Sequence, residues 1–185
     1  MMKAQFIDEL EKVKNFLKEG QFRDLELRIA SGSSSAPERL TAVTGQYRGR
    51  VVNLDFLPWK ENLYIKVLDL SLSSNFEMTI EKKEGESRLT PVKTRLPLTE
   101  MECENQGIWT KYQALATHLP GVEDFIRNSE DLKLLSQLED FERLKVDLRY
   151  LRVYRIFNLE DDLSAESTIR EIEILDQLAE NIEKI

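Results

Sequence analysis

One cysteine and one histidine are the residues of this 185-residue chain best suited to covalent or acid-base chemistry, and both fall within residues 103–118. These two residue types supply much of the nucleophilic attack, proton transfer and soft-metal binding found in proteins. A cysteine nucleophile needs a base within hydrogen-bond reach, for which His118 is the candidate. Cys103 stands between Glu102 and Glu104, whose carboxylates oppose formation of a thiolate. The sequence therefore predicts a structural or surface cysteine, and no catalytic residue.

Carboxylates near Cys103 could support two other kinds of chemistry. Glu100, Glu102 and Glu104 alternate along an extended segment and, with His118, could bind a hard divalent cation. No glycine-centred calcium-loop spacing is present, so we favour a solvated acidic edge and predict no metal ion and no cofactor. A hydrolase would need two carboxylates, for example Glu100 with one of the aspartates at 161–162, to converge in a cleft with unequal pKa values. We favour a non-enzymatic role.

The segment Gly45–Val52 (GQYRGRVV) has the most motif-like spacing in the chain. Gly45 and Gly49 among β-forming residues predict a bulge or a close approach of two backbones. Arg48 and Arg50 beside them could hold an anionic ligand through paired hydrogen bonds. A purely structural bend is the alternative that we favour.

Large apolar side chains predict a second kind of ligand site. Phe56 and Phe76 lie in segments of alternating hydrophobicity, and Trp109 follows in a less regular stretch. A curved sheet that wraps a long helix can leave an apolar cavity between the two, which would take a small apolar ligand. The candidate ligand-binding residues are therefore Arg48, Arg50, Phe56, Phe76 and Trp109.

Basic and aromatic residues interleave in segment 143–157, as in sheets that stack nucleic-acid bases. Acidic neighbours such as Glu142 and Asp147 dilute this positive charge. The formal net charge of −8, from 26 basic and 34 acidic residues, also opposes binding to a phosphate backbone. We predict a solvated strand face here, and no nucleic-acid partner.

Length and composition predict one folded domain over residues 1–185, because 41% of the residues are apolar and 32% are charged. A lone cysteine precludes an intramolecular disulfide, which fits a reducing compartment. Asp8 and Glu9 interrupt the apolar residues at the start, which argues against a signal peptide. No apolar run is long enough for a transmembrane helix. A soluble, cytoplasmic protein is the expectation.

Helical periodicity is strongest at the two ends of the chain. Phe6, Leu10, Val13 and Leu17 share one face of an N-terminal helix over residues 3–19, within an N-terminal segment 1–20 that Gly20 would close. A long closing helix is predicted over residues 164–184, capped by Ser164. Shorter helices are predicted from Pro120 and after an N-cap at Ser129.

Alternating apolar and polar residues predict an antiparallel sheet. The expected elements are a strand over 25–29, a flexible serine-rich loop at 31–37, a β meander over 40–83 with a turn at Pro58, a strand over 108–112, and β structure over 143–157. In the last of these the apolar positions change parity near 149–151. A strict period of two cannot change parity without a break, so the segment is either a tight hairpin or one bent strand.

Three strings carry a resemblance to a known family. From TGQYRGRVV through the β meander to LEDFERLKVD and the closing DQLAENIE, the chain resembles an uncharacterised prokaryotic domain family of unknown function. The resemblance covers about residues 40–185. Relatives in this family often accompany membrane segments, and the resemblance implies no catalytic residue and no ligand.

Taken together, these patterns predict an α+β domain in which an antiparallel sheet is covered on one face by the N-terminal and C-terminal helices. The predicted function is that of a non-enzymatic binding or protein-interaction module, with a protein partner or self-association as a homodimer. The alternative is a small-ligand-binding domain with an apolar cavity between the sheet and the C-terminal helix.

Overall fold

The computed structural model describes residues 4–27, 38–60, 63–74, 76–83, 89, 98–103, 107–117, 120–138, 140–158 and 163–185. Within them, nine strands form one antiparallel sheet in the order β1-β2-β3-β4-β9-β8-β5-β7-β6. The strands are β1 (Lys18–Leu27), β2 (Glu38–Tyr47), β3 (Arg50–Lys60), β4 (Leu63–Ser71), β5 (Met78–Lys82), β6 (Thr99–Glu100), β7 (Tyr112–Ala116), β8 (Arg143–Val146) and β9 (Tyr150–Asn158). The helices are α1 (Ala4–Phe16), α2 (Pro120–Arg127), α3 (Ser129–Gln137) and α4 (Ala165–Ile182), with a 3₁₀ turn, η1 (Gly107–Thr110).

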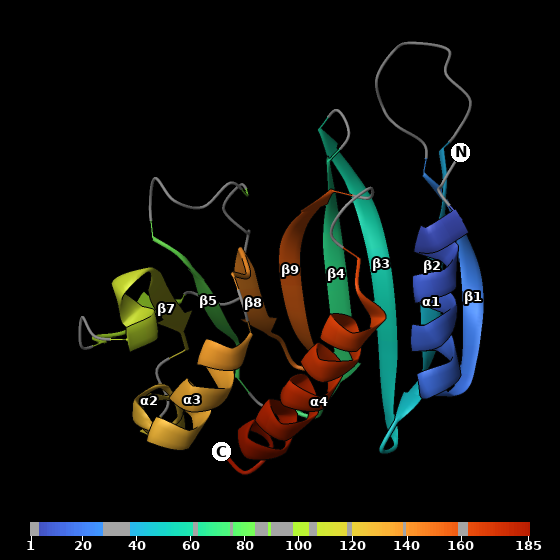
Figure 1. The fold of residues 1–185 in the computed structure, drawn as a ribbon. Helices are drawn as coiled ribbons and strands as arrows, with labels where there is room; N and C mark the ends of the chain where they lie inside the picture. The colour runs from blue at the N-terminus through green and yellow to red at the C-terminus, as the bar shows by residue number, and fades with distance from the viewer. Residues whose placement is uncertain are drawn as a thin grey trace.

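The helices gather on one face of the sheet, with α1 along β1 and β2, α4 across the middle, and α3 beside α4 (Figure 1). The predicted α+β layering, with terminal helices covering an antiparallel sheet, is therefore confirmed. Within the described residues, no helix combines the length and the apolar character that a membrane span requires.

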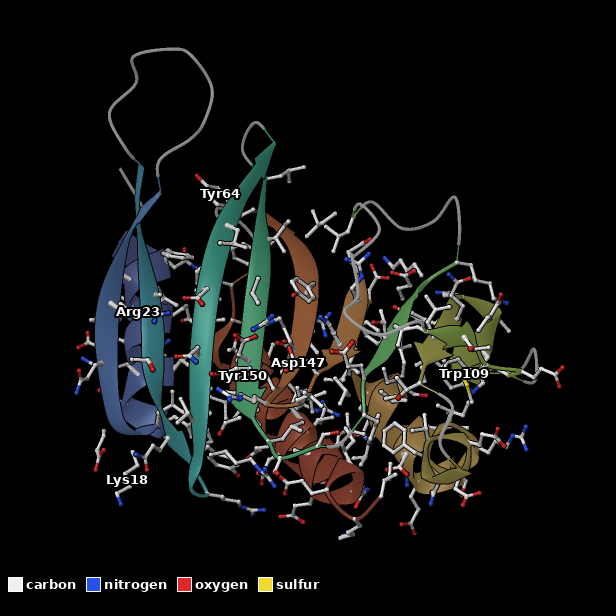
Figure 2. All side chains as sticks on the ribbon, turned by 180° about the vertical axis from the view of Figure 1, so that it is seen from behind. Lys18, Arg23, Tyr64, Trp109, Asp147 and Tyr150 are labelled. Atoms are coloured by element: carbon white, nitrogen blue, oxygen red, sulfur yellow. The ribbon has the colours of Figure 1, made fainter. Side chains whose placement is uncertain are left out.

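Strand alternation divides the sheet into an apolar and a polar face. One continuous cross-strand row faces the helices and is buried throughout: Leu54, Leu68, Val153, Leu144, Ile80 and Ala114. The adjacent row on the opposite face is mostly polar: Asn53, Asp69, Arg152, Lys145, Thr79 and Leu115. We call this opposite side the helix-free face; it is turned toward the viewer in Figure 2.

Both terminal helices form where apolar periodicity predicts them. Phe6, Leu10 and Val13 of α1 are buried, and the ring of Phe6 meets that of Phe56 edge-on, with 5.3 Å between the ring centroids. At the start of α4 the Ser164 hydroxyl accepts a hydrogen bond from the backbone N–H of Ser167 at 3.3 Å, as an N-cap does. Helix α1 therefore covers the core along β1 and β2, and α4 covers it over the middle of the sheet, as Figure 1 shows.

The sequence predicts that Gly20 ends the first helix, but Gly20 lies inside β1. The helix ends at Phe16, and β1 begins two residues later, well before the predicted start at Leu25. A Cβ atom on Gly20 would lie 2.0 Å from the carbonyl oxygen of Lys14, so this sharp helix-to-strand reversal requires glycine. Ile29 and the serine-rich segment 31–37 lie outside the described residues.

The predicted β meander holds only for β2, β3 and β4. Strand β5 pairs with β7 and β8, and β9 takes the place beside β4. Pro58 was predicted to mark a turn but lies within β3, next to a register shift between Pro58 and Lys60. Proline is tolerated in a strand at such irregularities because no ladder donor is needed there.

Residues 108–112 do not form the predicted strand. Gly107–Thr110 form η1, and the strand begins only at Tyr112. The N-cap of α3 is Asn128 rather than the predicted Ser129, because the Asn128 side chain accepts a hydrogen bond from the N–H of Glu130 at 2.8 Å.

The parity change in segment 143–157 arises from a hairpin, one of the two predicted alternatives. Strands β8 and β9 pair directly, and the turn occupies residues 147–149, slightly before the predicted position. The Asp147 carboxylate holds the turn by accepting hydrogen bonds from the N–H groups of Arg149 and Tyr150, both at 3.0 Å.

Candidate functional site

A cleft of about 750 Å³ lies between η1 and the helix pair α2–α3. Its apolar lining residues are Ile108, Trp109, Ile126 and Leu132. Its polar and remaining lining residues are Glu102, Cys103, Gly107, Arg127, Ser129, Lys133 and Ser136. A concave apolar surface with a few polar groups is the usual form of a small-molecule site.

Short elements hold the floor of this cleft in place. Trp109 is only 4% exposed, and η1 is closed by a hydrogen bond from the N–H of Lys111, the residue before β7, to the carbonyl oxygen of Ile108 at 3.1 Å. On the opposite side, the Asn128 cap separates α2 from α3, so that Ile126 and Leu132 approach from two different helices. The apolar floor is thus assembled from three elements.

Two cations stand at the polar side of the cleft. Arg127, at the end of α2, and Lys133, in α3, are exposed, and neither side chain forms an ion pair within the described part of the chain. Glu102 is the acidic residue among the lining side chains. The described lining therefore carries a net positive charge next to an apolar floor.

Cys103 lines this cleft as a thiol rather than as an activated nucleophile. Burial raises the pKa of Cys103, while a hydrogen bond from the backbone of Ala114 and the charge of Arg127 oppose the rise. The direction agrees with the sequence analysis, but the largest cause is burial, and the carboxylate that also raises the pKa is Glu100. His118 lies outside the described residues, so its distance from Cys103 is not described.

Among the predicted apolar ligand-binding residues, only Trp109 lines the cleft. Phe56 is fully buried and packs between Phe6 and Phe157, with its ring centroid 5.3 Å and 5.5 Å from theirs. Phe76 is also buried in the core. The structure therefore does not bring the three predicted aromatic residues together around one cavity.

The predicted anion-binding arginines contact α4 instead of facing an open site. Arg48 and Gly49 form the turn of the β2–β3 hairpin, with φ angles of 48° and 85°. Arg50 donates to Glu183 through both terminal nitrogens at 2.7 Å and to Asp176 through Nε at 3.0 Å. Arg48 Nη1 lies 3.4 Å from the same aspartate. Both arginines thus join the hairpin to α4.

A buried charge cluster at the sheet–α4 interface was not recognised from the sequence. Lys66 Nζ donates to Thr168 Oγ1 at 2.9 Å and to Glu171 Oε2 at 2.8 Å. Arg155 Nε lies 2.8 Å from the other oxygen of Glu171 as an ion pair without hydrogen-bond geometry. The signal was Lys66 itself, a lysine on the face of β4 that otherwise carries Tyr64, Leu68 and Leu70.

Acidic residues do not form a metal site within the described residues. No group of three or more histidine, cysteine, aspartate or glutamate side chains is arranged there to hold an ion. Glu100 and Glu102 are exposed. Glu104, His118 and the aspartates at 161–162 lie outside the described residues.

Comparison with known proteins identifies one similar fold. No family model and no curated protein matches the chain. Among solved structures, the chain is similar to the crystal structure of the mycobacterial trehalose monomycolate transport factor A, TtfA, with a TM-score of 0.63. The match covers 97% of this chain and 95% of the other, at 11% sequence identity. At this identity the similarity shows a shared fold and no shared residues of function.

Proposed function

We propose that the chain is a non-enzymatic binding module whose cleft between η1 and α2–α3 takes a ligand with an apolar body and an anionic group. The observation that carries this proposal is the apolar floor of Ile108, Trp109 and Leu132. Beside it stand two cations, Arg127 and Lys133, that form no ion pair with any described residue. Apolar contact would supply most of the affinity, and the cations would orient the acidic end.

Two further observations support binding rather than catalysis. The Cys103 thiol in the cleft has a raised pKa, so it is poorly suited to attack a substrate. TtfA, whose fold is similar, is named as a trehalose monomycolate transport factor. The cleft lies at one end of the sheet rather than between the sheet and the C-terminal helix, where an apolar cavity was expected.

The fluorescence of Trp109 provides a direct test. In a Trp59→Phe background, Trp109 is the remaining tryptophan of the chain, and we expect dodecanoate to change its emission in a saturable manner. The double substitution Arg127→Gln/Lys133→Gln should weaken binding about tenfold, because each solvent-accessible cation contributes roughly 0.7 kcal/mol. Leu132→Ser should weaken it through loss of the apolar floor.

A matched control is available at the other edge of the sheet. Lys18 is exposed on β1, far from Trp109 (Figure 2), so Lys18→Gln should leave the affinity unchanged. Dodecanoate binding that is equally tight in the cleft variants and in Lys18→Gln would overturn the proposed site.

A protein-interaction surface is the second candidate. Leu57, Ile65 and Ile156 form one cross-strand row on the helix-free face, and Leu57 is 37% exposed. Contiguous apolar side chains at a surface favour contact with a partner, including a second copy of the chain. Native mass spectrometry separates the two candidates, because it reports the number of chains and any retained small molecule in one measurement.

A further inference from the structure

A second cleft, of about 500 Å³, opens on the helix-free face of the sheet. It lies around the β8–β9 turn, where Asp147 and Tyr150 occupy the middle of that face (Figure 2). Its lining residues are Glu77, Lys145, Asp147, Leu148, Arg149, Tyr150 and Arg152. None of them contributes to the cleft between η1 and α2–α3.

Two buried acceptor groups beside this cleft have no partner in the described protein. Glu77 and Thr79 flank Met78, whose side chain belongs to the core, and they are only 4% and 3% exposed. Glu77 Oε2 and Thr79 Oγ1 are both buried without a hydrogen bond. A buried carboxylate oxygen without a donor is costly to the fold, so a ligand that supplies a donor there would relieve this cost.

Arg152, another lining residue, already has a partner. Both oxygens of the Asp69 carboxylate accept hydrogen bonds from the Arg152 guanidinium, with 3.1 Å between Nη2 and Oδ2. Asp147 accepts the two N–H groups of its own turn through Oδ1 alone. Arg152 therefore has little remaining capacity for a ligand, whereas Oδ2 of Asp147 has no hydrogen-bond partner among the described residues.

Two cations in the same cleft remain available. Lys145 is the cross-strand neighbour of Thr79, and Arg149 is exposed in the β8–β9 turn. Neither side chain forms an ion pair within the described ranges. The cleft thus combines one buried carboxylate that lacks a donor with two cations that lack an anion.

We infer that this cleft binds a small zwitterion that carries an ammonium group and an acidic group. The ammonium group would donate to Glu77, and a carboxylate or phosphate would bind Lys145 and Arg149. A simple anion would leave the buried Glu77 oxygen without a donor, and a simple cation would leave both basic side chains without a partner. The inference is independent of the function proposed for the other cleft.

Calorimetric titration with three related probes tests the inference. O-phosphoethanolamine carries both groups, whereas ethanolamine and inorganic phosphate each carry one. We expect the wild-type protein to bind O-phosphoethanolamine at least tenfold more tightly than either single-charge probe. Glu77→Gln should make O-phosphoethanolamine and phosphate bind equally, and Lys145→Gln/Arg149→Gln should abolish the preference for O-phosphoethanolamine over ethanolamine.

The variants keep the result interpretable. Lys145→Gln/Arg149→Gln alters side chains at the rim, so it tests the site even where Glu77→Gln fails to fold. Lys18→Gln, on the exposed edge strand β1 and outside both clefts, is the control and should bind O-phosphoethanolamine as the wild type does. Phosphate binding as tight as that of O-phosphoethanolamine, an unchanged affinity in Glu77→Gln, or no binding of any probe would each overturn the inference.

Discussion

One group of three charged side chains is held in the interior, between the sheet and α4. Glu171 on α4 lies between Lys66 of β4 and Arg155 of β9, and all three are largely shielded from solvent. Burial lowers the pKa of Lys66, and the charge of Glu171 opposes that shift. One carboxylate therefore compensates two buried cations. The loss of Glu171 should consequently affect the stability of the fold more than the loss of either cation.

This inequality predicts different effects of two substitutions. Glu171→Met leaves Lys66 and Arg155 buried without a carboxylate and should lower the free energy of unfolding by about 3–5 kcal/mol. Lys66→Met leaves Glu171 paired with Arg155 and removes a buried charge, so it should change the free energy by less than about 1 kcal/mol. Urea denaturation of both variants measures the difference. A Lys66→Met protein as unstable as Glu171→Met would contradict this account.

A second residue-scale prediction concerns pH. Hydrogen bonds from Arg50 and from the N–H of Ser73 hold the pKa of Glu183 below its ordinary value of 4.5. Because the folded-state pKa is lowered, the stabilisation from Glu183 is present above pH 4.5 and is lost as the pH falls through the folded-state pKa. Denaturant unfolding between pH 7 and about pH 3 should therefore show a weaker loss of stability in Glu183→Gln than in the wild type. Glu180→Gln, exposed on the same helix, is the control and should retain the wild-type slope.

At the scale of elements, the sequence predicts whether most segments are helices or strands and which face of each is buried. It does not predict which strands pair with one another. The alternation of Met78 and Ile80 identifies β5 and its buried face, because the side-chain period of a strand is two. The same alternation does not specify whether β5 pairs with β4 or with β8, since both partners present an apolar face. Only the completed sheet, in which β9 lies beside β4, resolves this choice.

The candidate site was predictable to the same limited extent. The single cysteine and the single histidine both fall within residues 103–118, and Cys103 and Trp109 of this stretch do line the cleft. The opposite side of the cleft comes from α2 and α3. In the sequence, Ile126 and Leu132 of these helices have the pattern of ordinary core residues, which does not distinguish them as lining a cleft. Contact between segments distant in the chain depends on tertiary packing, which periodicity does not encode.

Two glycines allow the element boundaries to be tested. Gly20→Ala would place a Cβ atom 2.0 Å from the Lys14 carbonyl oxygen, so α1 and β1 would have to separate. Gly49→Ala meets no atom within 4 Å and has only the strain of a φ angle of 85°, which costs about 1–2 kcal/mol. We expect Gly20→Ala to be less stable than Gly49→Ala by about 2 kcal/mol or more, measured by thermal and urea unfolding. Equal stability of the two variants would show that the α1–β1 junction can relax.

At the scale of the whole molecule, one apolar core connects all four helices through the sheet. The buried cluster includes Phe6 of α1, Ile126 of α2, Leu135 of α3 and Leu175 of α4. The Arg50 ion pairs with Asp176 and Glu183 add a polar connection between the β2–β3 hairpin and α4. A continuous core of this kind predicts that both ends of the sheet unfold together.

The two tryptophans report on this cooperativity from separate regions. Trp59 lies on β3, whereas Trp109 lies on η1 beside α2 and α3. In Trp109→Phe, fluorescence follows the β3 region, and in Trp59→Phe it follows the η1 region. Within each variant, the fluorescence midpoint in urea should coincide with the midpoint from far-ultraviolet circular dichroism, because a single core leaves no part able to unfold alone. Comparison within one variant removes the effect of the substitution itself on stability. A fluorescence midpoint that departs from the dichroism midpoint in either variant would divide residues 1–185 into two folding units.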